Sequence, residues 1–531
     1  MPEIYDVAVI GFGPAGEAAT GTLGTAGHRV VAFDRQPQMY PLPRMATFDG
    51  EACRTVQAVG TSIDAALESS SVLLTCTFTD ADFNPIIPMD WGGIQGGFPS
   101  HSSVWQPDVE ATMDDRIRTF PNVDVRRGWE LVELIQHDDH VELSVQPKNS
   151  TDESERETVR AKYVIGADGT NSTVRNLSGL DVKDYGLHER WLNFDMSLKR
   201  AIPEKMRALT LAMDPKRPHM YMPLGSKRER FEFRVHENET EEEMTNPQIV
   251  WDFIDEHYGL GPDDLEILRQ IVYHYYTRVA TQWGIGRVFI AGDAAHTMTP
   301  YMGQGGCSAI RDGRNIGWRL DLVLRGVSDP KILDDYQVER EAHVTQLVLT
   351  SHELSNLINM TDPKAAEERN YTILNHLAPP PAPFPKLEGG ALHREPDGSL
   401  APETGELAPQ GTLRRGDVEG RGDDVLRSAD RKDGNFQLIS LTEPDLNQDQ
   451  LDFFASIGGV IAVVGDASAR HAVVDVNGIY TDYLKGIGAD AYIMRPDWYL
   501  FGAAPAAGVS SLVDELREKL GATHKQAALV G

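Results

Sequence analysis

The feature that most constrains the fold of this chain is a glycine-rich turn between two short apolar segments. The first segment, IYDVAVI at residues 4–10, is rich in β-branched residues and predicts a buried strand. The turn GFGPAG follows at 11–16, and the small residues at 17–27 favour a helix packed closely on a sheet. A second strand is predicted at 29–33 and ends at Asp34, 18 positions after the last glycine of the turn. These elements predict a βαβ unit, whose acidic residue usually follows the turn by about 20 positions.

This unit has the chemistry of a dinucleotide-binding site. Gly11, Gly13 and Gly16 permit a tight turn and let backbone N–H groups approach a pyrophosphate at the start of the helix. Asp34 can accept hydrogen bonds from an adenosine ribose, and Arg35 beside it is assigned to the same site. The alternative is a glycine turn needed only for packing. The strand, turn, helix and acidic residue together favour the nucleotide.

Two later segments place an aspartate in a turn after a buried strand. GADGTNSTVR at 166–175 is either a plain strand-to-helix connection or part of a cofactor site. RVFIAGDAAH at 287–296 carries an aspartate that can accept a hydrogen bond from a ribityl hydroxyl. The glycine-rich loop after it precedes a predicted helix at 308–325, whose N-terminus offers backbone donors to an anionic flavin edge. The further cofactor candidates are Asp168, Gly169, Gly292, Asp293, Gly303, Gly305 and Gly306.

Composition narrows the class of protein and of partner. The 531 residues are enough for several domains, and 50 Lys and Arg against 80 Asp and Glu give a formal net charge of −30. This charge argues against nucleic acid or an anionic membrane surface as a partner. Cys53, Cys76 and Cys307 form no CxxC or Cys/His cluster, so neither a disulfide framework nor a metal site is expected. Because no long apolar run occurs, the expected location is a reducing cytoplasm.

The chain changes character once along its length. Residues 379–424 are dense in proline, glycine and charge, which predicts a linker or an irregular arm. Strand and helix patterns resume after it, from FQLISL at 436–441 to a predicted helix near 509–520. The C-terminal part therefore predicts a small separate α/β domain.

The three motifs, in this order, resemble those of the FAD-dependent aromatic hydroxylases, the single-component flavoprotein monooxygenases of the para-hydroxybenzoate hydroxylase type. The resemblance implies that the first motif binds the ADP part of FAD, the second contacts FAD and NAD(P)H, and the third holds the ribityl chain. PRMATFD at 43–49 looks like the family's arginine segment, which implies Arg44 beside the flavin or the pyridine nucleotide. WQPDVE at 105–110 looks like the segment whose glutamine, here Gln106, contacts FAD.

A narrower resemblance extends over nearly the whole chain. The segments DPKRPH at 214–219, GQGGCSAIRDGRNIGWRL at 303–320, GGALHRE at 389–395 and AYIMRPDWYLFGA at 491–503 are similar to 3-(3-hydroxyphenyl)propionate hydroxylases. The strand HMYM and the small residues after Gly305 depart from that pattern. These departures leave the identity of the substrate open, but they do not affect the implied reaction. The C-terminal domain resembles the thioredoxin-like tail of this subfamily. With no cysteine after position 307, its role is structural or oligomer-forming.

The fold that the resemblance implies is α/β: a Rossmann-like FAD-binding domain, an inserted β-sheet substrate domain and a C-terminal thioredoxin-like domain. The expected boundaries are 1–74, 106–180 and 276–378 for the FAD-binding domain, 75–105 and 181–275 for the substrate-binding domain, 379–430 for the linker or arm, and 431–531 for the thioredoxin-like domain.

The implied activity is that of a monooxygenase that consumes NADH or NADPH and dioxygen. A flavin C4a-hydroperoxide hydroxylates a phenolic ring, and the implied substrate is a 3-hydroxyphenylpropionate-like or other small phenol of aromatic catabolism. Two alternatives stay open: the same chemistry on a bicyclic, heteroaromatic or polyketide-type ring, and a non-catalytic flavin-binding redox sensor. The expected partners are a small aromatic substrate and a second copy of the chain in a homodimer, with no nucleic acid, membrane or metal.

Three residues are candidates for the chemistry at the substrate. Pro300 matches the family proline whose carbonyl faces the substrate hydroxyl, or it is a simple loop proline. His219 and Tyr221 share one face of a strand predicted at 219–224, where either could accept the phenolic proton. The alternative for both is a packed residue of the strand.

Four residues are candidates for substrate binding. Arg217 either meets a substrate carboxylate or is a surface arginine beside a proline. Trp91, Phe231 and Phe233 either line an apolar ring pocket or belong to the core.

Overall fold

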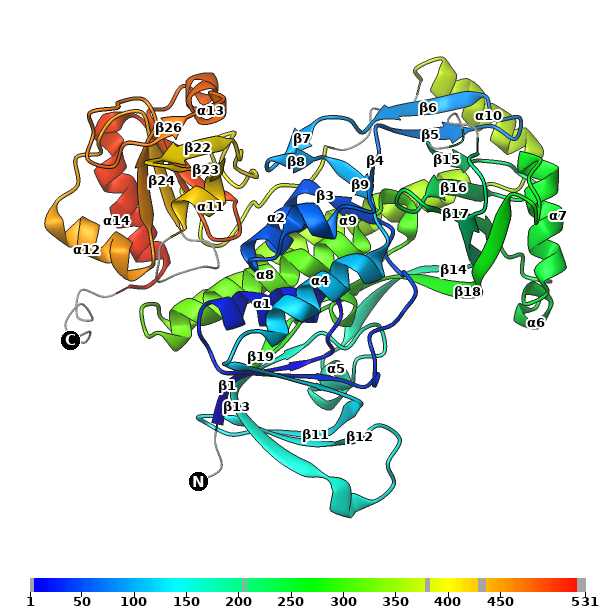
Figure 1. Ribbon diagram of the computed structural model, residues 1–531, viewed down its shortest axis with the longest axis horizontal. Coiled ribbons are helices and arrows are strands. Elements are labelled where there is room, and N and C mark those ends of the chain that lie inside the picture. The colour runs from blue at the N-terminus through cyan, green and yellow to red at the C-terminus, as the bar shows by residue number, and fades with distance from the viewer. Residues whose placement is uncertain (1–3, 203–205, 207, 378–382, 428–435, 523–531) are drawn as a thin grey trace.

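The computed structural model describes residues 4–202, 206, 208–377, 383–427 and 436–522, and the statements below concern these residues. They form a mixed α/β fold with two eight-stranded sheets and a four-stranded sheet near the C-terminus. In Figure 1 the C-terminal unit, orange to red, lies at one end of the molecule, and the second large sheet lies at the other. The long helices α8 (Gly305–Leu324) and α9 (Asp334–Ile358) run between them.

The first large sheet contains the predicted βαβ unit. Its parallel strands are, in spatial order, β10 (Val123–Arg127), β2 (Val30–Asp34), β1 (Ile4–Ile10), β13 (Glu157–Gly166) and β20 (Val288–Ile290). Antiparallel strands β12 (Val141–Pro147) and β11 (Trp129–Gln136) continue it beyond β13, and β19 (Gly284–Ile285) pairs with β20. The second half of β1 is fully covered, as expected of a central strand with parallel neighbours. The strand predictions at 4–10 and 29–33 are confirmed by β1 and β2.

Helix α1 (Pro14–Thr25) joins β1 to β2 and packs against α8 through residues without bulky side chains. A Cβ on Gly313 of α8 would lie 2.3 Å from the carbonyl oxygen of Ala15. One on Gly317 would lie 2.9 Å from the methyl carbon of Thr22. Both distances are shorter than real Cβ contacts, so glycine is required for this approach of the two helices.

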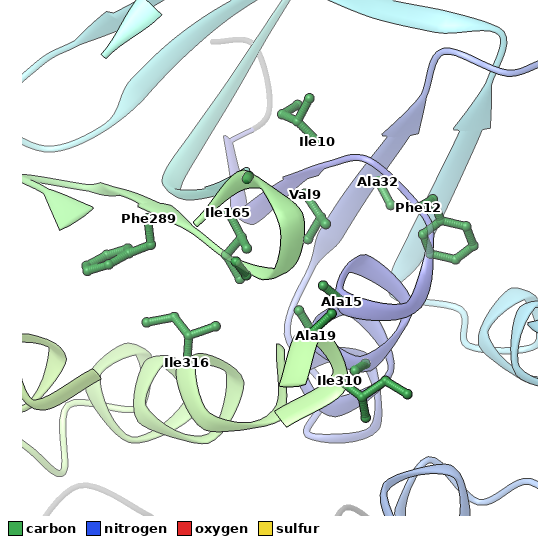
Figure 2. Packing of buried hydrophobic residues seen from close by; sticks show 14 of the residues in the cluster. Val9, Ile10, Phe12, Ala15, Ala19, Ala32, Ile165, Phe289, Ile310 and Ile316 are labelled. Atoms are coloured by element: carbon green, nitrogen blue, oxygen red, sulfur yellow. The ribbon is translucent and has the colours of Figure 1, made fainter. Parts of the chain in front are cut away.

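Figure 2 shows the core that this pair of helices closes. Ala19 of α1 and Ile310 and Ile316 of α8 belong to one cluster with Val9 of β1 and Ile165 of β13. Each is at most 2% exposed. Burial of one such aliphatic side chain contributes about 1.5–3 kcal/mol to stability. The helix prediction at 308–325 is confirmed by α8.

The second large sheet is antiparallel except at the pair β15–β5. Its order is β21 (His296–Thr297), β18 (Leu265–Ala280), β14 (Val182–Leu198), β17 (Arg228–Arg234), β16 (His219–Pro223), β15 (Leu209–Ala212), β5 (Thr75–Thr79) and β6 (Pro85–Asp90). Helix α7 (Pro247–Tyr258) covers one face of this sheet with Val250, Phe253 and Ile254. The opposite face is turned toward the first sheet.

The remaining elements of the first 377 residues are short connections. They are β3 (Thr47–Asp49), α2 (Gly50–Ala58), α3 (Ile63–Ala66), β4 (Ser71–Val72), β7 (Ile94–Gln95), β8 (Phe98–Pro99), β9 (His101–Ser103), α4 (Gln106–Arg118), α5 (Thr173–Leu177), α6 (Glu241–Met244) and α10 (Pro363–Leu374). None of the helices in the described part of the chain combines the length and apolar character that a bilayer crossing requires.

The C-terminal unit docks on α8 and α9 through buried charge. Its sheet has the order β25 (Val460–Val463), β24 (Gln437–Ser440), β27 (Ala491–Met494), β28 (Leu500–Ala504), with α12 (Gln448–Ser456), α13 (Ile479–Ile487) and α14 (Val509–Lys519). Glu339 of α9 lies 2.7 Å from both Arg319 of α8 and Arg495 of the unit. Burial alone would raise the pKa of Glu339, but the two arginines hold it at about 2. Removing one member of such a cluster costs about 3–5 kcal/mol.

The segment predicted as a linker or arm at 379–430 is only partly irregular. Residues 379–382 and 428–430 of it lie outside the described residues. Its second half forms β22 (Thr412–Arg415), β23 (Val418–Arg421) and α11 (Gly422–Leu426), and β22 pairs with β26 (Val474–Asp475) of the C-terminal unit. The glycines and charges at 414–424 belong to this hairpin and to α11, and the hairpin pairs with the C-terminal unit.

The contact between α1 and α8 predicts a specific sensitivity. In Gly313→Ala the new methyl group meets the backbone of α1, and we expect a loss of about 1–3 kcal/mol in unfolding free energy together with a lower FAD content. Denaturant unfolding and the flavin-to-protein ratio measure the two effects. The control is Gly486→Ala in α13, where a Cβ meets nothing within 4 Å. Equal stability of the two variants would contradict the argument.

Candidate active site

A cavity of about 620 Å³ is lined by residues of both large sheets. One end is formed by the first sheet and the starts of α1 and α8, and the other by strands β15 to β18 of the second sheet. Most of the predicted cofactor residues line it, namely Gly11, Gly13, Asp34, Arg35, Arg44, Gln106, Asp168, Gly169, Asp293, Gly303, Gly305 and Gly306.

The glycine turn opens the start of α1 toward the cavity. Gly11 has a φ of +95°, and a Cβ there would lie 2.2 Å from the carbonyl oxygen of Ala167. A Cβ on Gly16 would lie 2.0 Å from the carbonyl oxygen of Gly11, so Gly16 closes the turn and does not itself line the cavity. Gly13 and Ala15 do line it, and no side chain caps the helix. An uncapped helix start facing a cavity fits a pyrophosphate.

Asp34 connects the end of β2 to the glycine turn. Its Oδ2 accepts a hydrogen bond from the N–H of Phe12 at 2.9 Å, and its Oδ1 accepts one from the N–H of Gln36 at 2.7 Å. These bonds fix the carboxylate at the cavity wall. A carboxylate oxygen accepts more than one hydrogen bond, so Asp34 can still bind a ribose hydroxyl.

Gln106 is engaged with the protein itself. Its Oε1 accepts hydrogen bonds from the N–H groups of Arg44 at 2.7 Å and Met45 at 2.6 Å, and its Nε2 donates to Glu110 at 2.7 Å. The glutamine thereby fixes the 44–45 loop over the cavity. Burial raises the pKa of the lining residue Glu110 to about 7. Glu110 could not be predicted as a site residue from the sequence, because an acid on a helix is usually solvated.

The two aspartate motifs have different roles in the structure. Asp168 is the acceptor for the start of α5, where it binds the N–H of Thr173 at 2.7 Å. Asp293 is exposed to the cavity and lines it. Gly292 does not line the cavity: it has a φ of +61°, and its N–H donates to Asp312 at 3.0 Å. Gly292 therefore shapes the turn that presents Asp293.

The start of α8 forms a cradle that side chains would fill. A Cβ on Gly306 would lie 1.9 Å from the sulfur of Met45. Gly303 has a φ of +62°, and a Cβ there would lie 2.4 Å from the hydroxyl oxygen of Thr47. With the open start of α1, this cradle gives the cavity a glycine-lined path between two helix N-termini. That path fits FAD, whose anionic diphosphate and flavin edge both favour helix starts.

The opposite wall of the cavity, here called the sheet wall, is formed by alternate residues of β15 to β17 and by residues of β18. The cavity-lining residues of β15 to β17 and their neighbours on β18 are Leu209, Leu211, Met220, Met222, Arg230, Glu232, Ile271, Tyr273, His274, Tyr275 and Tyr276. Met220 pairs with Glu232, and Met222 pairs with Arg230. The even-numbered residues of β16 and β17 therefore face the cavity.

The charge on the sheet wall is neutralised within the protein. The guanidinium of Arg230 donates to Asp195 at 2.8 Å and to the carbonyl oxygen of Pro43 at 2.9 Å. Asp195 also forms an ion pair with Arg269 at 2.7 Å, and all three charged side chains are buried. Arg230 is thus committed to positioning the 43–44 loop.

Glu232 is the acid of the sheet wall. Its Oε1 accepts a hydrogen bond from the amide of Asn193 at 2.8 Å, while its Oε2 has no hydrogen-bond partner among the described residues. The same amide contacts the hydroxyl of Tyr275 at 3.2 Å. Burial and the nearby Asp195 carboxylate raise the pKa of Glu232 to about 7, against the opposing effect of Arg230.

Five of the seven residues predicted for catalysis or substrate binding do not reach the cavity, and their placement needs a correction. His219, Tyr221, Phe231 and Phe233 lie at odd-numbered positions, so the alternation of the strands turns them toward α7. Phe231 and Phe233 share one face of β17, and that face belongs to the core. Burial lowers the pKa of His219 to about 4. Arg217 does not line the cavity either and donates to Glu239 at 2.5 Å.

The remaining two candidates, Pro300 and Trp91, are both part of the cavity wall. Pro300 lines the cavity at the start of a short 3-10 helix, Pro300–Met302. Trp91 lines it too and stacks on His101 with ring centroids 4.2 Å apart. Tyr301, the next residue after Pro300, donates to the buried carboxylate of Glu189 at 2.7 Å.

Comparison with known proteins agrees with this geometry. A family model described as an FAD binding domain matches residues 4–351. A protein of Rhodococcus jostii (strain RHA1), named "Probable NADH-specific resorcinol 4-hydroxylase", is 33% identical over 96% of this chain and 94% of its own length. A 3-(3-hydroxy-phenyl)propionate/3-hydroxycinnamic acid hydroxylase of Mycolicibacterium gilvum (strain PYR-GCK) is 31% identical over 79% of this chain and 74% of its own. The chain belongs to this family of FAD-binding hydroxylases.

The solved structures show the same fold. The flavin-dependent monooxygenase PieE, solved with FAD and substrate, matches with a TM-score of 0.77 at 19% identity, over 98% of this chain and 99% of its own. The FAD-binding hydroxylase described here thus shares its fold with PieE along nearly the whole of both chains, although the two sequences have low identity.

The glycine turn predicts separable effects of two substitutions. Gly11→Ala forces a side chain into a positive φ and against Ala167, so we expect FAD binding at least about tenfold weaker and a less stable apoprotein. Gly13→Ala has room within the protein, so we expect weaker FAD binding with unchanged stability of the apoprotein. Flavin titration and thermal unfolding measure both. Undiminished FAD affinity in Gly11→Ala would contradict the assignment of this turn.

Proposed function

We propose that this chain is an FAD-dependent monooxygenase that uses NADH or NADPH and dioxygen to hydroxylate a small, uncharged phenol, with resorcinol as the first candidate. The observation that carries the substrate class is the chemistry of the sheet wall. It offers a carboxylate with a free oxygen and an arginine whose charge is already neutralised. The name of the relative from Rhodococcus jostii supports resorcinol and NADH as the first pair to test.

The sheet wall favours a neutral ring over a substrate carboxylate. A phenylpropionate needs a cation, but Arg230 is held by Asp195 and by backbone carbonyls. The approach of a second carboxylate to Glu232 would be repulsive. In the described cavity lining, Arg44 is the one other arginine near the sheet wall, and it belongs to the 44–45 loop. Its guanidinium lies 5.0 Å from the Tyr40 ring centre.

Glu232 has the position of a proton acceptor for the phenol. Asn193 holds one carboxylate oxygen by a hydrogen bond, so the unpartnered oxygen is the one that a substrate hydroxyl would meet. Accepting that proton makes the ring phenolate-like and so more nucleophilic at the ortho and para carbons. When bound, FAD would accept a hydride from NAD(P)H and, once reduced, activate dioxygen. The apolar residues Leu211, Met220 and Met222 orient the ring and exclude water.

The roles of the other lining residues follow from their places. We propose that the carbonyl of Pro300 faces a substrate hydroxyl and that Trp91 borders the ring. The glycines and aspartates of the cavity hold FAD, with Arg35 near its ADP part and Arg44 near the flavin or the pyridine nucleotide.

We also propose the domain division with boundaries at 74, 105, 180, 275, 378 and 430. The membership of the two large sheets supports it, apart from the last residues of β18 and the short β21, which belong to the second sheet but lie within the 276–378 segment. For residues 431–531 we propose a thioredoxin-like domain. Its parallel β24–β25 pair and antiparallel β24–β27–β28 strands support that topology.

The tail holds no cysteine, and its buried contacts to α8 and α9 support a structural role. The three free, buried thiols support a cytoplasmic location. A homodimer is the proposed assembly, to be checked by light scattering.

A substrate panel tests the proposed function. The FAD-loaded protein is assayed for NADH and NADPH oxidation, oxygen uptake and product mass with resorcinol and with 3-(3-hydroxyphenyl)propionate. We expect resorcinol to gain one oxygen atom and to have a kcat/KM at least about tenfold above that of the propionate. Preference for the propionate, abolished by Arg44→Ala, would show that the 44–45 loop supplies a carboxylate site and would overturn the neutral-substrate proposal.

The pKa of Glu232 predicts a pH dependence. The acceptor is the ionised form, so kcat/KM for the phenol should rise with pH through about 7 in the native protein. In Glu232→Gln we expect this rise to disappear and kcat/KM at pH 8 to fall by about 10²-fold. The matched control is Glu229→Gln, since Glu229 lies on the same strand but not in the cavity lining. A Glu232→Gln variant that keeps FAD and the native pH profile would exclude the role.

A further inference from the structure

A second group of chemically active side chains lies on the far side of the second sheet. Asp214, His219 and His257 each offer a ligand atom, and these three atoms lie within 4.8 Å of one another. Asp214 and His219 come from the approach to β16 and its first residue, while His257 is at the end of α7. None of the three lines the cavity, so they belong to a site separate from the active site.

Hydrogen bonds fix the tautomers of both imidazoles. The Nδ1–H of His219 donates to the carbonyl oxygen of Arg217 at 2.9 Å, and the Nδ1–H of His257 donates to that of Phe253 at 3.0 Å. A carbonyl only accepts, so each ring must carry its proton on Nδ1. Each Nε2 then holds a lone pair. Carbonyl acceptors orient metal-binding histidines in the same way.

The buried Nε2 of His219 is the atom that indicates a bound ligand. His219 is 1% exposed, and its Nε2 has no hydrogen-bond partner among the described residues. A buried polar atom left without a partner costs about 1–3 kcal/mol, so such atoms usually have a bound water or ion. Aromatic rings surround it, with Phe83 and Phe253 in edge contact.

Asp214 and His257 complete the ligand set. Asp214 is buried, and its Oδ1 accepts a hydrogen bond from the N–H of Lys216 at 2.8 Å, which leaves Oδ2 for a cation. His257 is only half-buried, which gives an ion a route from solvent. Tetrahedral zinc needs ligand atoms about 3.4 Å apart, so binding would draw the three groups slightly together.

We propose that Asp214, His219 and His257 bind a Zn²⁺ ion, with water as the fourth ligand, and that this ion fastens the end of α7 to the second sheet. Two imidazoles and one carboxylate suit zinc better than the oxygen-seeking Mg²⁺ or Ca²⁺. Because α7 covers the sheet whose other face is the sheet wall, the ion stabilises the wall without touching the substrate.

Metal binding by the FAD-loaded full-length protein tests this proposal. Zn²⁺ affinity is measured by competition with a chromophoric chelator, bound zinc by elemental analysis, and stability by thermal unfolding with Zn²⁺ or Mg²⁺. We expect one tightly bound zinc per chain, a higher unfolding temperature with Zn²⁺ only, and two histidine ligands in the zinc X-ray absorption spectrum.

Substitutions locate the ion. His257→Gln and Asp214→Asn should each weaken Zn²⁺ binding by at least about tenfold, and Asp214→Asn keeps an acceptor for the Lys216 N–H. The matched control is His137→Gln, because His137, His140 and Glu142 form a second, more exposed group of possible ligands. Three outcomes overturn the proposal: no zinc retained by the native protein, zinc lost in His137→Gln, or unchanged affinity in both His257→Gln and Asp214→Asn.

Discussion

The crossing of α1 and α8 is the contact on which the site depends. Gly313 and Gly317 let the two helices approach so closely that a methyl group in their place would meet backbone or side-chain atoms. Both helices begin at the cavity, one at the glycine turn of β1 and the other at the loop after Asp293. The spacing between these two helix starts is therefore set by the packing of small residues one to three turns further along. A cofactor whose central diphosphate meets one helix start and whose flavin meets the other would need that spacing to be fixed before it binds.

The second sheet positions the rest of the site by the alternation of its strands. One face packs on α7 through aromatic and aliphatic side chains, and the other presents Met220, Met222, Arg230 and Glu232 to the cavity. Buried charge on that face is tolerated because Asp195 is shared by two arginines. The arginines need the shared carboxylate, and Glu232 lies at the edge of this network, held by an amide rather than a close ion pair. An acid in that setting can change its protonation state near neutral pH.

Much of the cofactor half could be predicted from the sequence, because glycine spacing and strand ends are local properties. The turn at 11–16 and the aspartates at 34 and 293 were identified in this way, and they line the cavity. The substrate half could not. The pattern RFEFR shows that aromatic and charged residues alternate, but not which face an α-helix from residues 247–258 will cover. Read alone, Glu232 and Arg230 look solvated and Phe231 and Phe233 look like a ring pocket, and the structure reverses both. Which face of β17 lies in the core is decided by the packing of α7 and the neighbouring strands of the second sheet.

The central proposal is that the sheet wall binds a neutral phenol whose hydroxyl meets Glu232. A crystal structure of the FAD-loaded protein with resorcinol bound would test this directly. We expect a phenol oxygen within about 3.2 Å of a Glu232 carboxylate oxygen, with Arg230 still paired to Asp195. A phenol bound elsewhere in the cavity, or an arginine released from Asp195 to meet the ligand, would contradict it.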